Sequence, residues 1–256
     1  MLFRNWLAGA MGTPGDYSYS PMHLWTVAVV LAATLAVAFF GYKNRSHPRR
    51  NRGLLVAISL FQLAFEISWR LIYLFVNDSP AVSLWPMYPC NLGGILIPVI
   101  ALCKLRRLKK LFYVFGFVGG VITFAIPDGI FSTDVLVFPI LKSILQHTGL
   151  LLIPTLEYTS GSYRASLKDL GWIVGGSLIH VVNCEIIVRF MGLTGDYMFF
   201  RSGLPFVIPG VPQFITLSVV ALSIFVLLCY FSDKKASTDF LTRHHLLHRH
   251  SVITAK

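Results

Sequence analysis

Charged residues are scarce in this chain. Asp, Glu, Lys and Arg make up only 13% of its 256 residues, against roughly a quarter in ordinary soluble domains. Hydrophobic residues reach 55%. This balance excludes a typical soluble globular protein and favours a protein that lives in a lipid bilayer.

Short motifs for metal, nucleotide or hydrolase chemistry are also missing. The four cysteines, at positions 90, 103, 184 and 229, include no CxxC pair, so we predict no metal site. No P-loop, GxSxG or HExxH motif occurs, and we expect no cofactor. A disulfide between Cys90 and Cys184, which both fall near the outer ends of their predicted spans, stays open beside the alternative of two free thiols.

Apolar runs long enough to cross a bilayer are abundant. About 20 apolar residues are needed for one helical crossing. We predict seven such spans, at roughly 22–42, 53–76, 85–103, 110–127, 137–157, 169–189 and 206–231. They leave no room for a separate soluble domain, so the predicted fold class is all-α, a polytopic membrane helical bundle.

The predicted domain organisation follows from these spans. Residues 1–21 form an N-terminal extracytoplasmic segment, 22–231 a seven-helix transmembrane domain and 232–256 a basic cytoplasmic tail. The first residues lack the sustained apolar stretch of a cleaved signal. They predict either a short interfacial helix over 2–11 or a disordered lead-in. We expect a multi-pass protein of the cell membrane.

The net charge of +11 is concentrated in alternate loops. Loops 43–52 and 104–110 carry five Lys or Arg residues each, whereas loops 77–84 and 128–136 carry none. This alternation follows the positive-inside rule, so we predict the N-terminus outside and the C-terminus inside. Basic loops beside a membrane favour anionic lipid head groups, and we expect no nucleic-acid partner.

Polar residues inside the predicted spans are candidates for function, because burying them in lipid is costly. Counted from the outer boundary, the polar residues of several helices fall at a similar depth. They are Glu66, Arg70, Cys90, Asn91, Asp128, Ser143, His147, His180 and Asn183. This common depth predicts one shared cavity in the outer half of the membrane, level with the ester bonds of lipids.

Most of these groups also have a structural interpretation. Glu66 and Arg70, four residues apart on one helix, can neutralise one another as an ion pair that locks helices together. His180 and Asn183 can supply hydrogen bonds between helices. A lone buried cysteine such as Cys90 is more often an inert packing residue than a nucleophile.

Several short segments, in their order and spacing, resemble the YwaF-like family of integral membrane proteins, the transmembrane protein 164 family. They are FQLAFEISWRLIYLF, YPCNL, FAIPDG, FPILKSILQHTGLLLIP and VNCEI. Glu66 of the second predicted helix, Asp128 after the fourth and His147 of the fifth match bacterial members. The Pro-Cys step at Cys90 and the Asn-Cys step of the last segment are more similar to animal members.

The resemblance implies a helical membrane fold related to intramembrane lipid hydrolases. For the animal branch it also implies acyl transfer between phospholipids through a cysteine thioester, with phospholipids or lysophospholipids as partners. Carried over, it marks Cys90 as the nucleophile and His147 as its base. One position departs, because the family commonly has His after the cysteine where this chain has Asn91. Either His147 alone serves as the base, with Asn91 or a backbone N–H near Pro89 as the oxyanion donor, or the catalytic set is incomplete here. We expect the charge of Lys142 to favour the thiolate.

Two other classes of function remain open. A small-molecule or lipid transporter would use the same cavity without chemistry, although the spans show no clear inverted repeat or paired broken helices. A non-catalytic accessory protein would need the polar groups only for packing.

The predicted topology can be tested with reporter fusions. A reporter fused after Arg50 or at the C-terminus should report the cytoplasm, and one inserted in loop 128–136 should report the exterior. An interior signal from loop 128–136 would overturn the assignment of depth to every polar group.

Overall fold

The structure is a computed structural model that describes residues 1–76, 84–127, 129–198, 200, 208–240 and 242. Within these ranges every long element is a helix and no strand is formed, which confirms the all-α fold class. Seven helical segments correspond in order to the seven predicted spans. They are α2 (Pro21–Lys43), α3 (Pro48–Val76), α4 (Pro89–Leu102), α5 (Arg106–Ala125), α6 (Phe138–Thr159), α7 (Leu170–Val181) continued by η3 (Val182–Ile187) and α8 (Val188–Phe190), and α9 (Gln213–Ser232).

Five described helical stretches are long and apolar enough to cross a membrane: α2, α3, α5, the stretch Leu167–Phe190 and α9. The α4 helix is equally apolar but has only 14 residues. The α6 helix has 22 residues and carries several polar ones, including Lys142 and Gln146. The chain is therefore a multi-pass membrane protein with a polytopic helical bundle.

Prolines set the helix starts that the sequence analysis placed wrongly. The third span was predicted from residue 85, but α4 begins at Pro89, the favoured first position of a helix. The last span was predicted from residue 206, part of which lies outside the described residues, and α9 begins at Gln213 directly after Pro212. A residue before proline is pushed out of the helical region, so neither helix begins before its last proline, and turns and bends precede it.

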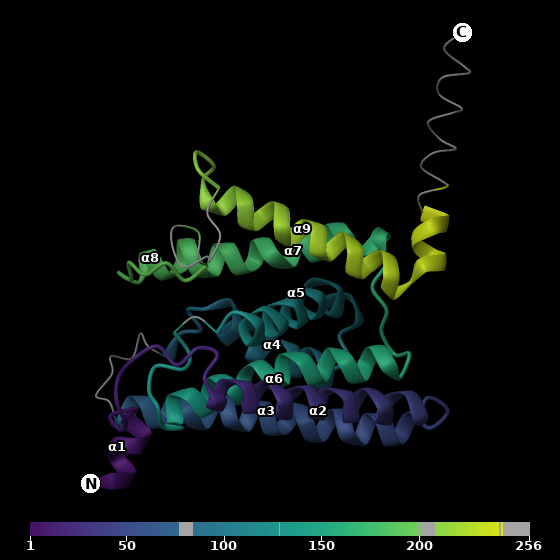
Figure 1. Ribbon diagram of the computed structural model, residues 1–256. Helices are drawn as coiled ribbons and strands as arrows, with labels where there is room; N and C mark the ends of the chain where they lie inside the picture. Colours follow the sequence, from purple (N-terminus) through teal and green to yellow (C-terminus); the bar gives the residue numbers. More distant parts are fainter. Residues whose placement is uncertain (77–83, 128, 199, 201–207, 241, 243–256) are drawn as a thin grey trace.

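The basic segments meet at one end of the bundle, called the basic end below. The guanidinium of Arg45 donates to Thr159 O at 2.6 Å. Arg52 donates to Ala101 O and Leu102 O, each at 2.6 Å, and so caps the end of α4. Figure 1 shows the chain leaving α9 at this same end, with the N-terminus at the other. The alternation of charged loops predicted this grouping; which side of the membrane it faces stays a prediction.

The N-terminal segment is folded onto the opposite end. A short helix, α1 (Leu2–Ala8), stops where Gly9 takes a left-handed φ of 74°. The following residues pack on the loop between α5 and α6, where Gly15 N donates to Ser132 O at 3.0 Å. Trp6 Nε1 donates to Leu136 O of the same loop at 2.9 Å. Of the two predicted alternatives, a short helix or a disordered lead-in, the structure has a helix, but α1 ends at Ala8 and the predicted range ended at residue 11.

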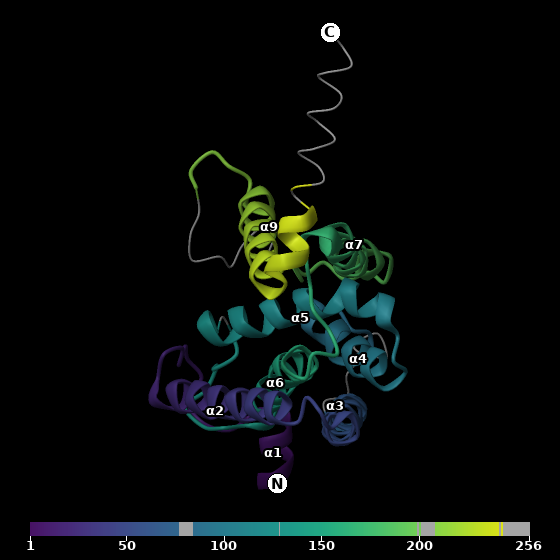
Figure 2. The same cartoon turned by 90° about the vertical axis from the view of Figure 1, so that its right-hand side faces the viewer.

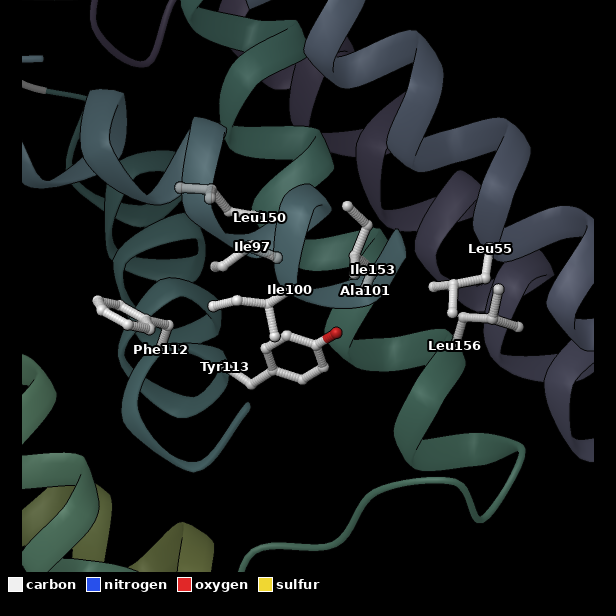
Figure 3. Packing of buried hydrophobic residues seen from close by; sticks show 9 residues of the cluster. All are labelled: Leu55, Ile97, Ile100, Ala101, Phe112, Tyr113, Leu150, Ile153 and Leu156. Atoms are coloured by element: carbon white, nitrogen blue, oxygen red, sulfur yellow. The ribbon is translucent and has the colours of Figure 1, made fainter. Parts of the chain in front are cut away.

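The helices lie in three layers. Figures 1 and 2 show α2 and α3 on one side, α4, α5 and α6 in the middle, and α7 with α9 on the other side. Buried apolar side chains from α3, α4, α5 and α6 form the largest cluster, part of which is seen in Figure 3. The α7 helix comes close to α5 at Gly176, where an added Cβ would collide with Leu111 O.

Two lysines of the basic loops turn into the protein. Lys109 Nζ lies 2.6 Å from Glu157 Oε1 of α6, and both residues are buried. Lys110 Nζ lies 2.6 Å from Asp169 Oδ1, at the start of the next helix. These cations therefore join helices at the basic end instead of facing lipid head groups.

Candidate functional site

The α3 helix presents a buried carboxylate at its centre. Glu66 is fully buried. Its Oε1 accepts from Gln62 Nε2 at 3.3 Å, and its Oε2 accepts from Trp69 Nε1 at 2.9 Å. Arg70 forms an ion pair with the same Oε2. The i, i+4 pair that the sequence suggested is thus present, and the carboxylate is compensated within its own helix.

Arg70 is fixed by more than this ion pair. Its Nη1 donates to Glu66 O at 2.9 Å, and its Nε donates to Leu84 O at 3.2 Å in the segment before α4. The guanidinium also lies 4.7 Å from the ring centroid of Trp69. Arg70 therefore ties α3 to the chain that leads into α4.

The side-chain oxygen of Asn91, in α4, is approached by donors of its own helix and of α6. Its Oδ1 accepts from Lys142 Nζ at 3.0 Å and from Gln146 Nε2 at 2.9 Å, both of α6. The thiol of Cys90 lies 3.9 Å from the same oxygen. One oxygen atom thus brings the thiol and the ammonium of Lys142 into one hydrogen-bonded group.

A protonated Lys142 gives this site an excess of positive charge. The ion pairs found among the described residues do not include Lys142. Its ammonium instead lies 4.1 Å from the ring centroid of Trp69, besides its bond to Asn91. Glu66 and Arg70 neutralise one another, so a protonated Lys142 would add one positive charge that an anion could balance.

Cys90 lies in the first turn of α4. Tyr88, the N-cap residue, provides no side-chain hydrogen bond to this turn, and Pro89 has no N–H. The first N–H groups of a helix have no partner within it and point at whatever lies before the helix. Cys90 is itself only partly buried. A thiol, the first backbone N–H groups of α4 and a nearby basic side chain therefore share one location.

Close packing of α4 depends on a glycine. A Cβ added at Gly94 would lie 2.7 Å from Glu66 Oε1 and 3.1 Å from Gln146 Nε2. Only a residue without a side chain lets the three helices approach to this distance. Asn91, one turn earlier on α4, is consequently within reach of α6.

Ser143 and His147 face a different direction from Lys142 and Gln146. His147 Nδ1 lies 2.7 Å from Ser143 O and 3.3 Å from Ser143 Oγ, and its ring packs edge-on to Phe124 of α5. Five residues separate His147 from Lys142, a rotation of about 140° around a helix. Within the described part of the chain, no hydrogen bond joins His147 to Cys90.

His180 also lies apart from the Asn91 group. Its Nδ1 lies 2.8 Å from Gly176 O in its own helix, and its ring stacks on Phe115 with centroids 4.2 Å apart. The ring of Phe112 meets it edge-on at 5.5 Å. These contacts are those of a core histidine between α7 and α5. Asp128, another candidate, lies outside the described residues.

Asn183 holds the segment that precedes Cys90. Its Oδ1 accepts from Trp85 Nε1 at 2.8 Å, and its Nδ2 donates to Pro86 O at 2.7 Å. Asn183 belongs to the π-helical turn η3, a form of helix often found at functional sites. The turn therefore positions Cys90 indirectly, because it holds the segment that leads into α4. All four cysteines are free, so Cys90 and Cys184 form no disulfide.

Two members of the site were not selected from the sequence. Gln146 lies four residues after Lys142, a spacing that places both side chains on one face of a helix and was the signal for it. Trp85 was considered only as part of a span. Its bond to Asn183 joins residues 98 positions apart, which no local pattern reveals.

Comparisons with known proteins give one family. The model of the TMEM164 family matches residues 18–230, most of the chain. No curated protein and no solved structure matches.

The role of the Glu66–Arg70 pair can be tested by stability measurements in detergent. Glu66→Gln should lower the free energy of unfolding by about 3 kcal/mol, because a buried guanidinium then lacks its counter-charge. Combining it with Arg70→Met should recover much of this loss.

The pair Glu185–Arg189 offers a control with the same i, i+4 spacing, in which the arginine side chain is 49% exposed. Arg189→Gln should cost less than about 1 kcal/mol. If the double variant at 66 and 70 is as unstable as Glu66→Gln alone, the two residues have separate roles.

Proposed function

The chain belongs to the TMEM164 family, and we propose that it is an enzyme of the cell membrane that transfers acyl chains between phospholipids through a thioester on Cys90. The proposal combines the activity that the motif resemblance implies with the chemistry of the Asn91 group, which consists of Asn91, Cys90, Lys142 and Gln146. A helical membrane protein is surrounded by phospholipids, which are the substrates of the proposed reaction.

One observation carries the proposal: the thiol of Cys90 and the ammonium of Lys142 both approach Asn91 Oδ1. A buried cation without a carboxylate partner favours an anion beside it. The thiolate of Cys90 is the anion that this chain can itself provide. Since the thiolate is the nucleophilic form of cysteine, the arrangement suits attack on an ester.

The reaction has two balanced halves. In the first, Cys90 Sγ attacks the carbonyl carbon of a phospholipid ester, and the glycerol oxygen leaves with the proton that the thiol gave up. The products are an acyl thioester and a lysophospholipid. In the second, the hydroxyl of another lysophospholipid attacks the thioester, its proton returns to sulfur, and a new phospholipid leaves.

The oxyanion of each tetrahedral intermediate needs hydrogen-bond donors. Asn91 Oδ1 is already an acceptor, so its Nδ2 amide is the part that can donate. The N–H groups of the first turn of α4 are the other donors near the thiol. This assignment keeps the oxyanion role that the sequence suggested for Asn91.

The resemblance and the geometry differ on which residue acts as the base. The resemblance gives this role to His147, which would have to leave its bond to Ser143 O and turn to the other face of α6. Lys142 needs no such movement, because it already shares an oxygen with the thiol. We therefore favour Lys142 as the base: its neutral amine takes the thiol proton, which gives a thiolate beside an ammonium, and His147 is the alternative.

A second function rests on the same excess charge. The partly buried ammonium of Lys142 beside Trp69 also suits the phosphate of a lipid. A transporter would bind that phosphate at Lys142 without forming a covalent bond, and Cys90 would be a bystander.

Purified protein incubated with a labelled phospholipid and a lysophospholipid separates these functions. Wild type should redistribute acyl chains, and mass spectrometry should find an acyl adduct on Cys90 that hydroxylamine releases. Cys90→Ala should abolish both transfer and adduct. Lys142→Met should slow adduct formation at least tenfold. Cys103→Ala, at an exposed thiol, is the matched control and should leave both unchanged.

The variant His147→Ala decides the base. Transfer at the wild-type rate supports Lys142, and loss of transfer returns the role to His147. If Cys90→Ala still moves lipid between leaflets and no adduct forms in wild type, transport replaces the enzymatic proposal.

A further inference from the structure

The basic end contains a cavity that no part of the Cys90 site touches. It has a volume of about 370 Å³ and lies between α2, α5, α6 and α9. Small-molecule sites usually have about 300–1,000 Å³. Its wall is mostly apolar, with Val114 and Phe117 of α5, Pro154 of α6, and Leu228 of α9 among its side chains.

The rim of the cavity faces the surroundings of the bundle. Phe231, in the last turn of α9, is 70% exposed, and Tyr158, in the last turn of α6, is 41% exposed. Both line the cavity. The medium around these helices is lipid, so the molecules that reach this opening are lipids, and their chains match its apolar wall.

Three residues of the cavity wall carry a hydroxyl group that is covered by protein and has no hydrogen-bond partner among the described residues. The residues Tyr113, Tyr163 and Ser232 line it, and their hydroxyl oxygens are buried without a hydrogen bond among the described residues. An unmade bond of a buried polar group costs roughly 1–3 kcal/mol. A ligand that presents acceptors next to an apolar chain would remove this cost. Ester carbonyl oxygens of a phospholipid have this arrangement.

Exposed cations follow two of these residues in the chain. Arg164 follows Tyr163 directly, and Lys234 stands two residues after Ser232; both are exposed. Of the nearby carboxylates, Glu157 and Asp169 form the ion pairs with Lys109 and Lys110, and Asp233 Oδ1 accepts from Ala236 N at 3.1 Å. Arg164 and Lys234 are thus two cations against the one charge of Asp233, and their sum is positive.

We propose that this cavity binds one acyl chain of an anionic phospholipid from the leaflet at the basic end. The chain fills the apolar space, the ester carbonyl meets the hydroxyl groups, and the phosphate lies by Arg164 and Lys234. The order apolar, hydroxyl, cation along the protein matches the order chain, ester, phosphate along the lipid. This site is separate from Cys90, and it stands whether or not Cys90 forms a thioester.

Native mass spectrometry of the full chain, delipidated and then titrated with phosphatidylglycerol or phosphatidylcholine, tests the proposal. Wild type should bind one phosphatidylglycerol more tightly than phosphatidylcholine, by roughly fivefold for each basic residue involved. Thr34→Phe, which fills the cavity from α2, should lose this binding. The control Leu35→Phe places the same ring on the lipid-facing side of α2, where Leu35 is 61% exposed, and should bind as wild type does.

A second pair of variants addresses the head group. Arg164→Gln with Lys234→Gln should bring the affinity for phosphatidylglycerol down to that for phosphatidylcholine. Thermal unfolding of each variant checks its fold, and Thr155→Leu fills the same cavity from α6 if Thr34→Phe is unstable.

Three results would overturn the proposal. They are retention of the lipid in both cavity-filling variants, equal affinity for the two lipids in wild type, and a dimer of the chain that only the cavity-filling variants dissolve. The last result would make a second copy of the chain the occupant.

Discussion

The buried carboxylate of Glu66 is the constraint on which the packing of the candidate site depends. A carboxylate in the bilayer core has no water to solvate it, so the protein must supply a counter-charge and donors. Gln62, Trp69 and Arg70 supply them from α3 itself. All of them lie on one face of the helix, and that face must turn inwards. The absence of a side chain at Gly94 then admits α4 against the carboxylate.

A structural pair alone would leave this interior neutral. Glu66 and Arg70 already form one, so the ammonium of Lys142 is an addition that the packing of α3 does not need. The ring of Trp69 and the amide oxygen of Asn91 reduce the cost of that charge but do not cancel it. An interior built only for stability would do better with an apolar residue at this position. An ammonium at this position would suit the thiolate of the proposed reaction.

The sequence was sufficient to predict the fold class and the contact between two residues of one helix. It did not predict which way side chains face, because that depends on how neighbouring helices are rotated against one another. Composition and loop charges predict a multi-pass bundle because hydrocarbon imposes both. The spacing of Glu66 and Arg70 predicts their contact because one helix carries both. Depth alone grouped His147 and His180 with Cys90, yet each turns to the aromatic side chains of α5. Depth follows from counting residues, but the direction a side chain faces follows from how neighbouring helices pack.

The length of α4 sets how deep Cys90 lies in the membrane. With 14 residues the helix spans about 21 Å, whereas the hydrocarbon core is about 30 Å thick. Arg52 caps its other terminus at the basic end. Its first turn therefore falls roughly 9 Å short of the opposite boundary. The ester bonds of lipids lie at that boundary, so the thiol and the N-terminal donors of α4 lie below them, inside the hydrocarbon. Asn183 and Arg70 secure the non-helical chain that covers the remaining distance. Irregular backbone at this depth is tolerated where protein groups satisfy it. The proposed reaction therefore requires a lipid ester to move inwards by roughly this distance to reach Cys90.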